Sequence, residues 1–291
     1  MEDVVVLDGV TKIYPGFQLD SLSFTIKKGF IHGFIGRNGA GKTTTIKLMM
    51  NLVKRDAGTI QIFGLDNRMH EKEIKQRIGF VYAENHFYEE LTVEQMKRVV
   101  ASFYRKWDEQ TFQRYLKLLD VPLKKKIKHL SKGMKVKFSI ALALSHNADL
   151  IVMDEPTSGL DPVVRREILE LMSELIQDGE KTVFFSTHIT SDLEQIADYI
   201  TFIHEGRIYF SLTKEEIADL YGIVKGGPDL LNRENRKLFI GLRETPYGFE
   251  GLTKEMKKAR EIFGDRAIYE APSLDEIMVY TVKGNTKHQE A

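Results

Sequence analysis

Residues 36–43 read "GRNGAGKT" and follow a short apolar run, "FIHGFI". Gly36, Gly41, Lys42 and Thr43 fit the pattern G-x-x-x-x-G-K-[ST]. In this pattern the glycines let backbone N–H groups curl around phosphate oxygens without a Cβ in the way. The lysine supplies positive charge to the β- and γ-phosphates, and the hydroxyl is a ligand for Mg²⁺. The stretch therefore predicts a nucleotide-phosphate site in a loop that joins a strand to a helix.

The residues after this loop predict a helix. Ile46, Met49, Met50 and Val53 recur with the i, i+3, i+4, i+7 spacing of one helix face. A helix that begins at the loop points its positive end at the bound anion. We therefore expect the loop and the residue after it to contact the nucleotide: Gly36, Arg37, Asn38, Gly39, Ala40, Gly41, Lys42, Thr43 and Thr44.

Further apolar runs place the loop in a layered α/β fold. "LIVMD" (150–154) and "TVFFS" (182–186) predict buried strands, each followed by a helix. Such alternation implies a parallel sheet covered on both faces. The opening segment and "TIQIFG" have short apolar runs between turn residues, which is typical of antiparallel strands. Residues 92–128 read as helices, the first of them started by a capping box at Thr92 and Gln95.

Two adjacent acids follow the strand predicted at 150–154. Asp154 is expected to hold Mg²⁺ opposite Thr43, and Glu155 to polarise an attacking water as general base. A strand that merely ends in charged residues is the alternative, and the phosphate loop in the same chain favours the site. His188 follows the strand "TVFFS", where open α/β sheets bind ligands, which favours a functional over a structural histidine.

Composition excludes several classes of protein. The chain has 291 residues, a hydrophobic fraction of 42%, and 42 basic against 42 acidic residues. The zero net charge argues against a broad basic field, so no nucleic-acid partner is expected, although "PLKKKIK" is a local basic patch. Without cysteine there is no disulfide, thiolate metal site or cysteine nucleophile. No signal peptide is evident, and the best apolar stretch, "FSIALALSHNADLIVM", is interrupted before the about 20 residues that a membrane span needs.

Taken together, these stretches resemble the nucleotide-binding subunit of an ATP-binding cassette (ABC) transporter over roughly residues 4–215. "LSKGM" stands where that family has its LSGGQ signature: Leu130, Ser131 and Gly133 match, and Lys132 and Met134 depart. "SGLD" resembles the family's D-loop: Ser158, Gly159, Leu160 and Asp161. His188 matches the switch histidine, and Tyr14 the aromatic that stacks on adenine. An ordinary strand-end aromatic is the alternative for Tyr14.

The resemblance implies how the signature works. In the family two subunits pair head-to-tail around two ATP molecules, and the signature of one faces the phosphate loop of the other. Ser131 would then hydrogen-bond the γ-phosphate, and Gly133 would allow close backbone approach. The family's usual glutamine after the strand "IGFVY" is replaced by Ala83, and Glu84 next to it is a further candidate for the metal or its water. "ENHFYEELTVEQ" suits a groove for a membrane partner, with a loop folded on the protein's own helices as the alternative.

The resemblance also predicts the fold and domains. We expect an α/β fold: a P-loop NTPase parallel-sheet core with an N-terminal antiparallel β subdomain, a helical subdomain and a small C-terminal α/β module. The ATPase domain would span 1–215, with the helical subdomain at about 85–147, and "KGGPD" would open the accessory module at 228–291.

Three classes share this cassette: transporter subunits, chromosome or DNA-repair ATPases, and ribosome-associated translation factors. The interval between phosphate loop and signature is too short for the second class, and a single cassette disfavours the third. Residues 39–64, "GAGKTTTIKLMMNLVKRDAGTIQIFG", also resemble exporters whose membrane subunit is a separate chain. The resemblance therefore implies an ATP- and Mg²⁺-dependent ATPase that powers a separate permease, as an exporter of peptides, antibiotics or lipids. It would be a homodimer, or a heterodimer with a second ABC subunit, in the cytoplasm at the inner face of the cell membrane. A stand-alone regulatory, nucleic-acid- or ribosome-associated ABC ATPase is the alternative.

Overall fold

The computed structural model describes residues 2–83 and 86–289, with residues 283–289 as backbone only. The chain divides into two compact units, Met1–Ser211 and Leu212–Ala291. The boundary that the sequence places at "KGGPD" thus lies inside the second unit. The reason is that β11 (Gly222–Gly226), just before that stretch, is an inner strand of the second unit's sheet.

The first unit contains a six-stranded sheet in the order β10-β9-β3-β8-β7-β6 among the described residues. Its strands are β3 (Ile31–Ile35), β6 (Ile78–Val81), β7 (Leu150–Asp154), β8 (Thr182–Thr187), β9 (Tyr199–His204) and β10 (Arg207–Thr213). β6, β7, β8, β3 and β9 pair in parallel. Every residue of β3, β7 and β8 is buried, as the continuous apolar runs predicted.

A four-stranded sheet in the order β2-β1-β4-β5 accompanies it. Its strands are β1 (Asp3–Tyr14), β2 (Phe17–Lys27), β4 (Ala57–Ile62) and β5 (Leu65–Asp66). β1 pairs antiparallel with β2 and β4, which confirms the prediction for the opening segment and "TIQIFG". Phe24 of β2 stacks on Phe34 of β3 and Phe184 of β8, so a shared core joins the two sheets.

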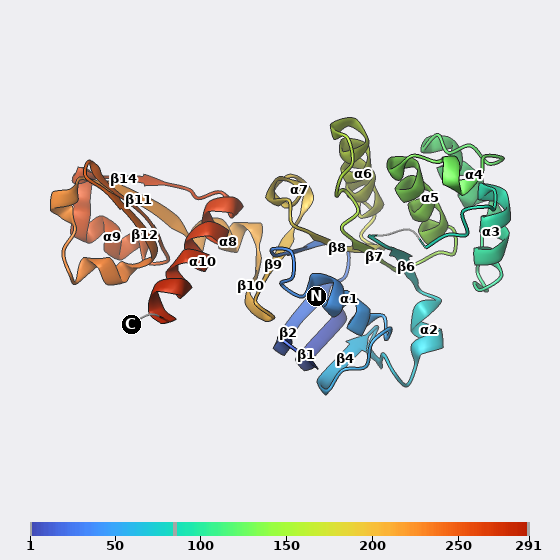
Figure 1. Ribbon diagram of the computed structural model, residues 1–291, viewed down its shortest axis with the longest axis horizontal. Helices are drawn as coiled ribbons and strands as arrows, with labels where there is room; N and C mark the ends of the chain where they lie inside the picture. The colour runs from blue at the N-terminus through green and yellow to red at the C-terminus, as the bar shows by residue number, and fades with distance from the viewer. Residues whose placement is uncertain (1, 84–85, 290–291) are drawn as a thin grey trace. The chain divides into compact units, whose positions relative to one another are not determined.

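Helices cover both faces of the parallel sheet. α1 (Lys42–Met49) and the antiparallel sheet lie on one side, and α6 (Pro162–Leu175) and α7 (Thr190–Ile196) lie on the other (Figure 1). The helix predicted to reach Val53 ends at Met49, because Asn51 adopts a left-handed φ of 52° that stops it.

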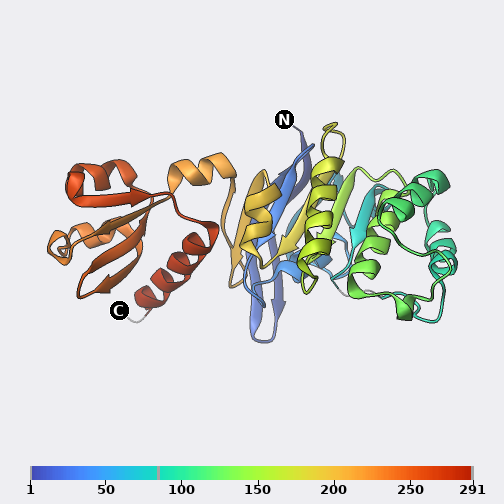
Figure 2. The same cartoon turned by 90° about the horizontal axis from the view of Figure 1, so that it is seen from above.

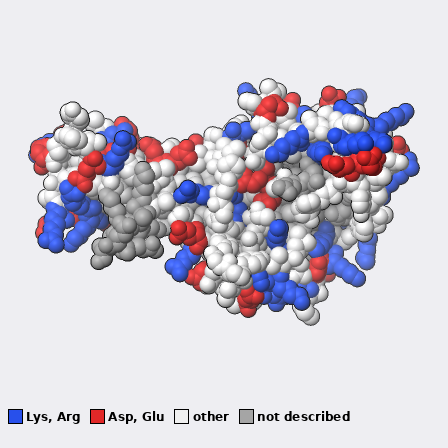
Figure 3. All heavy atoms as spheres, viewed as in Figure 1, with Lys and Arg blue, Asp and Glu red and all other residues white. Residues whose placement is uncertain are grey.

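Three further helices of the first unit gather beyond β6, as Figure 2 shows from above. They are α3 (Val93–Ala101), α4 (Glu109–Leu118) and α5 (Lys132–Leu144), whereas α2 (Glu71–Lys75) lies apart from them in Figure 1. The predicted capping box is present, since Thr92 accepts from the Gln95 N–H and the Gln95 side chain accepts from the Thr92 N–H. Figure 3 shows acidic and basic groups side by side over α3, α4 and α5. In the loops next to these helices, Glu90 pairs with Lys126 and Lys128.

The second unit is an antiparallel sheet in the order β12-β13-β11-β14. Its elements besides β11 are α8 (Lys214–Leu220), β12 (Phe239–Thr245), β13 (Gly248–Thr253), α9 (Met256–Phe263), β14 (Ala267–Glu270) and α10 (Leu274–Gln289). Phe249 packs with Phe263 of α9, and its neighbour Glu250 accepts from Tyr280 of α10. Because successive strand residues point to opposite faces, α9 and α10 cover opposite faces of this sheet.

Candidate functional site

The phosphate loop joins β3 to α1 and depends on two glycines. A Cβ at Gly36 would lie 2.4 Å from the Ile203 carbonyl oxygen, so the loop runs against β9 too closely for any other residue. Gly41 has a φ of 113° and precedes Lys42, the first residue of α1. The strand, loop and helix succession predicted around the loop is confirmed.

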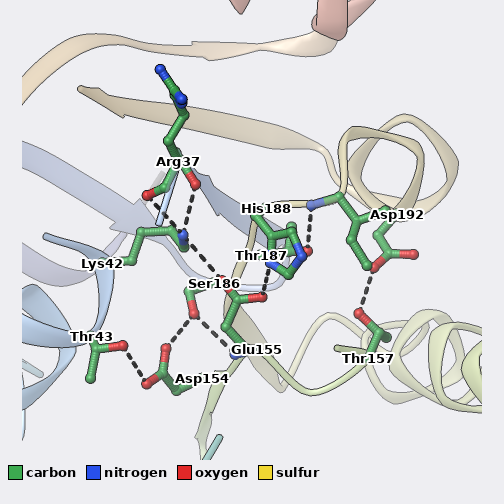
Figure 4. Close-up of polar contacts among 12 residues, drawn as sticks. Arg37, Lys42, Thr43, Asp154, Glu155, Thr157, Ser186, Thr187, His188 and Asp192 are labelled. Carbon is green, nitrogen blue, oxygen red and sulfur yellow. Dashed lines mark hydrogen bonds and ion pairs between the residues drawn. The ribbon is translucent and has the colours of Figure 1, made fainter. Parts of the chain in front are cut away.

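Lys42 lies under the loop and is almost fully buried. Its Nζ donates to the carbonyl oxygens of Gly36 at 2.7 Å and Arg37 at 3.4 Å. The same Nζ lies 3.1 Å from Oε1 of Glu155, which follows β7 (Figure 4). The lysine of the loop and the acid at the strand end therefore meet at the carboxyl edge of the parallel sheet.

Thr43 and Asp154 are also brought together. The Thr43 hydroxyl donates to Oδ2 of Asp154 at 2.9 Å, and the other carboxylate oxygen, Oδ1, accepts from the Ser186 hydroxyl at 2.5 Å. Asp154 is 4% exposed, and only hydroxyl groups hydrogen-bond its carboxylate among the described residues. Hard oxygen atoms in this arrangement suit a cation such as Mg²⁺.

Glu155 and His188 form the third contact of the site. Nδ1 of His188 lies 2.7 Å from Oε2 of Glu155, so Lys42 and His188 each contact one oxygen of the same carboxylate (Figure 4). β7 and β8 are neighbours in the sheet, which is why residues 33 positions apart can meet here. Glu155 has a left-handed φ of 49°, which is uncommon outside glycine and marks strain of the kind found at functional sites.

A cavity of about 540 Å³ adjoins the outer side of the loop. Its lining comes from the β1–β2 hairpin, the phosphate loop and the β9–β10 hairpin: Gly16, Phe17, Gln18, Asp20, Arg37, Asn38, Gly39, Ala40, His204, Glu205 and Arg207. Tyr14, at the end of β1, is 37% exposed and is not in this lining. His204, Glu205 and Arg207 were not among the site residues predicted from the sequence.

The signature begins α5. The Ser131 hydroxyl accepts from the Met134 N–H at 3.2 Å as the helix N-cap, while Leu130 and Gly133 are buried. A Cβ at Gly133 would meet Val164 of α6 at 2.9 Å, so this glycine also permits close helix packing. None of the hydrogen bonds among the described residues joins the signature to the phosphate loop of the same chain.

The segment after Glu155 leads into α6 and contacts the signature. Asp161 caps α6 by accepting from the Val163 and Val164 N–H groups. Gly159 has a φ of 65°, and Nζ of Lys132 lies 2.9 Å from the position that a Cβ there would take. Lys132, the residue that departs from the usual signature, thus lies against the "SGLD" turn of its own chain.

The comparisons with known proteins agree with this geometry. A family model described as "ABC transporter" matches residues 19–158. The bacitracin transport ATP-binding protein BcrA of Bacillus licheniformis is 36% identical over 211 residues, which are 72% of this chain and 69% of that protein. The chain belongs to the ABC transporter family.

Two further relatives extend the match. The uncharacterized ABC transporter ATP-binding protein YhcH of Bacillus subtilis (strain 168) is 34% identical over 307 aligned positions, covering 100% of this chain and 94% of that protein. A solved structure of an ATP-binding subunit of an ABC transporter is 29% identical with a TM-score of 0.67, covering 74% of this chain and 91% of the other. The α/β fold with a P-loop NTPase core is therefore confirmed.

As an ABC transporter ATP-binding protein, the chain binds ATP and is an ATPase. Within residues 2–83 and 86–289, no helix is both long and apolar enough to cross a membrane. Ala83 comes after β6, where the family usually has glutamine. Glu84, named above as a candidate near the metal, lies outside the described residues.

Proposed function

We propose that this chain hydrolyses ATP with Glu155 as the general base, and that it thereby powers a separate membrane permease. The contact that supports this best is the Glu155 carboxylate held between Lys42 at 3.1 Å and His188 at 2.7 Å. A base, a phosphate-binding cation and a second polar group thus converge beside the phosphate loop.

The residues present fit ATP together with Mg²⁺. The loop Gly36–Thr44 supplies the N–H groups and Lys42 the charge for the phosphates, and Thr43 and Asp154 supply oxygen ligands for the ion. Mg²⁺ is usually held by one or two carboxylates plus phosphate oxygens and water, which matches a single aspartate and a hydroxyl. Bound there, the ion would neutralise charge on the phosphates.

In this proposal Glu155 accepts a proton from water while the water oxygen bonds to the γ-phosphorus. The bond from that phosphorus to the β–γ bridging oxygen breaks, and ADP leaves with the electron pair. Lys42 stabilises the charge that builds up on the phosphate oxygens, and His188 orients the Glu155 carboxylate through its 2.7 Å contact. Tyr14, the exposed last residue of β1, is proposed to stack on adenine.

We further propose that two cassettes pair head-to-tail around ATP. Ser131 is exposed at the first turn of α5, so its hydroxyl and the turn's N–H groups are available to an anion on a partner. Because no hydrogen bond among the described residues links this turn to its own phosphate loop, we propose that the γ-phosphate it contacts lies in the partner's site. The signature Leu130–Met134 and the D-loop Ser158–Asp161 would then act across the interface.

A permease partner is supported by an apolar cavity of about 320 Å³ next to β6 and α3. Phe80, Tyr82, Phe87, Met96 and Leu142 are among its lining residues, and they suit an apolar segment of a membrane protein. We propose an exporter of peptides, antibiotics or lipids, since one relative is named for bacitracin transport. The chain would lie at the inner face of the cell membrane through this partner.

ATP binding and turnover of purified Lys42→Ala test the assignment of the loop. Removing the phosphate-binding charge should reduce turnover by about 100-fold or more and weaken ATP binding. Lys47→Ala, an exposed lysine on the same helix, is the matched control and should keep both properties. Near-normal turnover in Lys42→Ala would contradict the proposal. Co-purification of the tagged chain with a multi-span membrane protein separates an exporter subunit from a stand-alone ATPase.

A further inference from the structure

Ser186, the fifth residue of β8, contacts both acids of the site, although no pattern in the sequence singles it out. Its side chain is fully buried at the carboxyl end of the strand. The hydroxyl donates to Oδ1 of Asp154 at 2.5 Å and accepts from the Glu155 N–H at 3.0 Å (Figure 4). One hydroxyl therefore links the proposed metal ligand to the backbone of the proposed base.

The Asp154 contact fixes the direction of the carboxylate. Because Oδ1 accepts from Ser186, Oδ2 is the oxygen that faces Thr43 at 2.9 Å. Without the Ser186 donor, a carboxylate that is 4% exposed would lose half of its hydrogen bonds and could rotate about its last torsion. Hydrogen bonds to a metal-binding side chain commonly orient it in this way.

The Glu155 contact fixes the backbone at the strained position. The Glu155 N–H is shared between the Ser186 hydroxyl at 3.0 Å and the Ser186 carbonyl oxygen at 3.1 Å. Glu155 has a φ of 49°, which persists only where the surroundings hold it. The peptide orientation that directs the Glu155 side chain between Lys42 and His188 thus depends partly on this hydroxyl.

We infer that Ser186 is a positioning residue. Its hydroxyl holds the Asp154 carboxylate and the Glu155 backbone in the orientations that hydrolysis requires, an inference that rests on the proposed function. Because one hydroxyl contacts both the proposed metal ligand and the proposed base, a single substitution of Ser186 should disturb the orientation of both residues. Among the described residues, no hydrogen bond joins Ser186 to the phosphate loop. Substitution of Ser186 is therefore expected to preserve ATP affinity in the absence of Mg²⁺.

The test compares Ser186→Ala with Thr182→Val on the same strand. Thr182 is also fully buried and its hydroxyl accepts one hydrogen bond, from the Gly29 N–H at 3.0 Å, at the opposite end of β8. Both changes remove a buried hydroxyl, so thermal melting of the full chain should fall to a similar extent. Only Ser186→Ala should lower kcat, by about 10- to 100-fold, with KM for ATP within about threefold.

A binding measurement without turnover separates positioning from general support. ATP affinity is measured at equilibrium in EDTA and then with excess Mg²⁺. The ATP affinity of Ser186→Ala in EDTA should match that of the parent. The increase in ATP affinity on adding Mg²⁺ should be smaller than in the parent. Ser186→Thr, which keeps the hydroxyl, should restore kcat and the Mg²⁺ gain.

The inference is overturned if Ser186→Ala keeps the parental kcat, or if Thr182→Val lowers kcat as much as Ser186→Ala does. It is also overturned if the ATP affinity of Ser186→Ala falls equally with and without Mg²⁺. A Glu155→Gln variant that keeps the parental kcat would instead contradict the proposed function, and the inference with it. The two failures are therefore distinguishable in the same set of measurements.

Discussion

Arg165 of α6 donates from Nε to Oδ1 of Asp192 at 2.6 Å, and Asp192 is fully buried in α7. The other carboxylate oxygen accepts from the Thr157 hydroxyl at 2.6 Å. Thr157 comes directly before the "SGLD" turn, and Asp192 lies four residues after His188. One buried carboxylate thus connects the segment after Glu155 with the segment after the histidine.

Arg165→Ala should destabilise the first unit by about 2–3 kcal/mol, because it leaves a buried carboxylate without its cation. This is below the usual cost for fully buried pairs, since the Arg165 side chain is 29% exposed. The control is the neighbouring Arg166→Ala: Arg166 is 76% exposed and pairs with Glu170, so about 0.5 kcal/mol or less is expected. Urea unfolding of both variants checks this. Equal destabilisation by the two changes would show that the Arg165–Asp192 pair stabilises the protein no more than an exposed ion pair does.

Glu155→Gln should keep ATP bound while hydrolysis falls by about 100-fold or more, because the amide cannot accept the proton from water. The glutamine side chain is nearly the same size as that of glutamate, so it can still fit between Lys42 and His188 although it carries no charge. With ATP the variant should accumulate as a dimer on size-exclusion chromatography. Turnover at the parental rate would show that another group is the base.

Mixing two inactive variants tests whether the signature acts on the partner's ATP. Lys42→Ala disables the phosphate loop, and Ser131→Arg blocks an exposed signature position. Gly133→Asp is less suitable, since any side chain there meets Val164 of the same chain at 2.9 Å. A mixed dimer contains one site with both defects and one intact site only if the signature works in trans. ATP turnover, or ATP-dependent pairing, should therefore recover on mixing.

No recovery in mixed dimers whose formation is shown directly would contradict the trans assignment of Ser131. Each variant measured alone at the same total concentration is the control. Recovery that also appears with two copies of Lys42→Ala would point to contamination rather than complementation.

Lowering the pH from about 6.5 to about 4 should reduce the free energy of unfolding because of His32. Burial lowers the pKa of His32 from 6.5 to about 4, and its Nε2 accepts from the Lys27 N–H at 2.9 Å while the ring stacks on Tyr199. In this window the unfolded chain binds a proton that the folded chain excludes, so the free energy of unfolding decreases as pH falls. A shift of this size corresponds to at most about 3.4 kcal/mol.

Urea unfolding at pH 7 and pH 5 measures the effect. His32→Gln should lower stability at pH 7 but show a smaller loss on going to pH 5 than the parent. An unchanged difference between the two pH values would show that other groups cause the acid sensitivity.

Deleting residues 214–291 should weaken ATP-dependent pairing and leave ATP binding in place. The site residues all precede this segment, and the cut falls after the last residue of β10, so the six-stranded sheet stays whole. The second unit has a core of its own, built on Val224, Phe249 and Phe263. Size-exclusion chromatography with ATP, in the Glu155→Gln background, compares pairing of the two forms. A folded but non-binding truncated protein would contradict this separation of roles.

The sequence predicted what short patterns encode. The phosphate loop and the buried strands at 150–154 and 182–186 rest on local composition, and the structure has each of them. Glu155 and His188 were assigned from their positions after strands, and the 2.7 Å contact between them follows from the pairing of β7 and β8.

What the sequence did not predict depends on contacts between distant segments. Ser186 looks like any small residue in a buried strand, and only the neighbouring strand makes it a partner of Asp154. Likewise Lys132 and Gly159 are 27 positions apart, and nothing in either stretch indicates that they meet. The end of α1 was misplaced because apolar periodicity does not indicate the left-handed φ of Asn51. "KGGPD" lies inside the second unit, and its glycines do not indicate that β11, just before it, pairs on both sides.

The place of β3 between β8 and β9 has a consequence for how the protein folds. β3 ends at residue 35 and β8 begins at residue 182, so the phosphate loop gains its neighbours only when segments very distant along the chain have joined. The β1–β2 hairpin is local and can form early, whereas this parallel pairing is slow by topology. Nucleotide capture during refolding therefore reports completion of the central sheet, and ATP would stabilise the finished state by mass action without accelerating the steps before it.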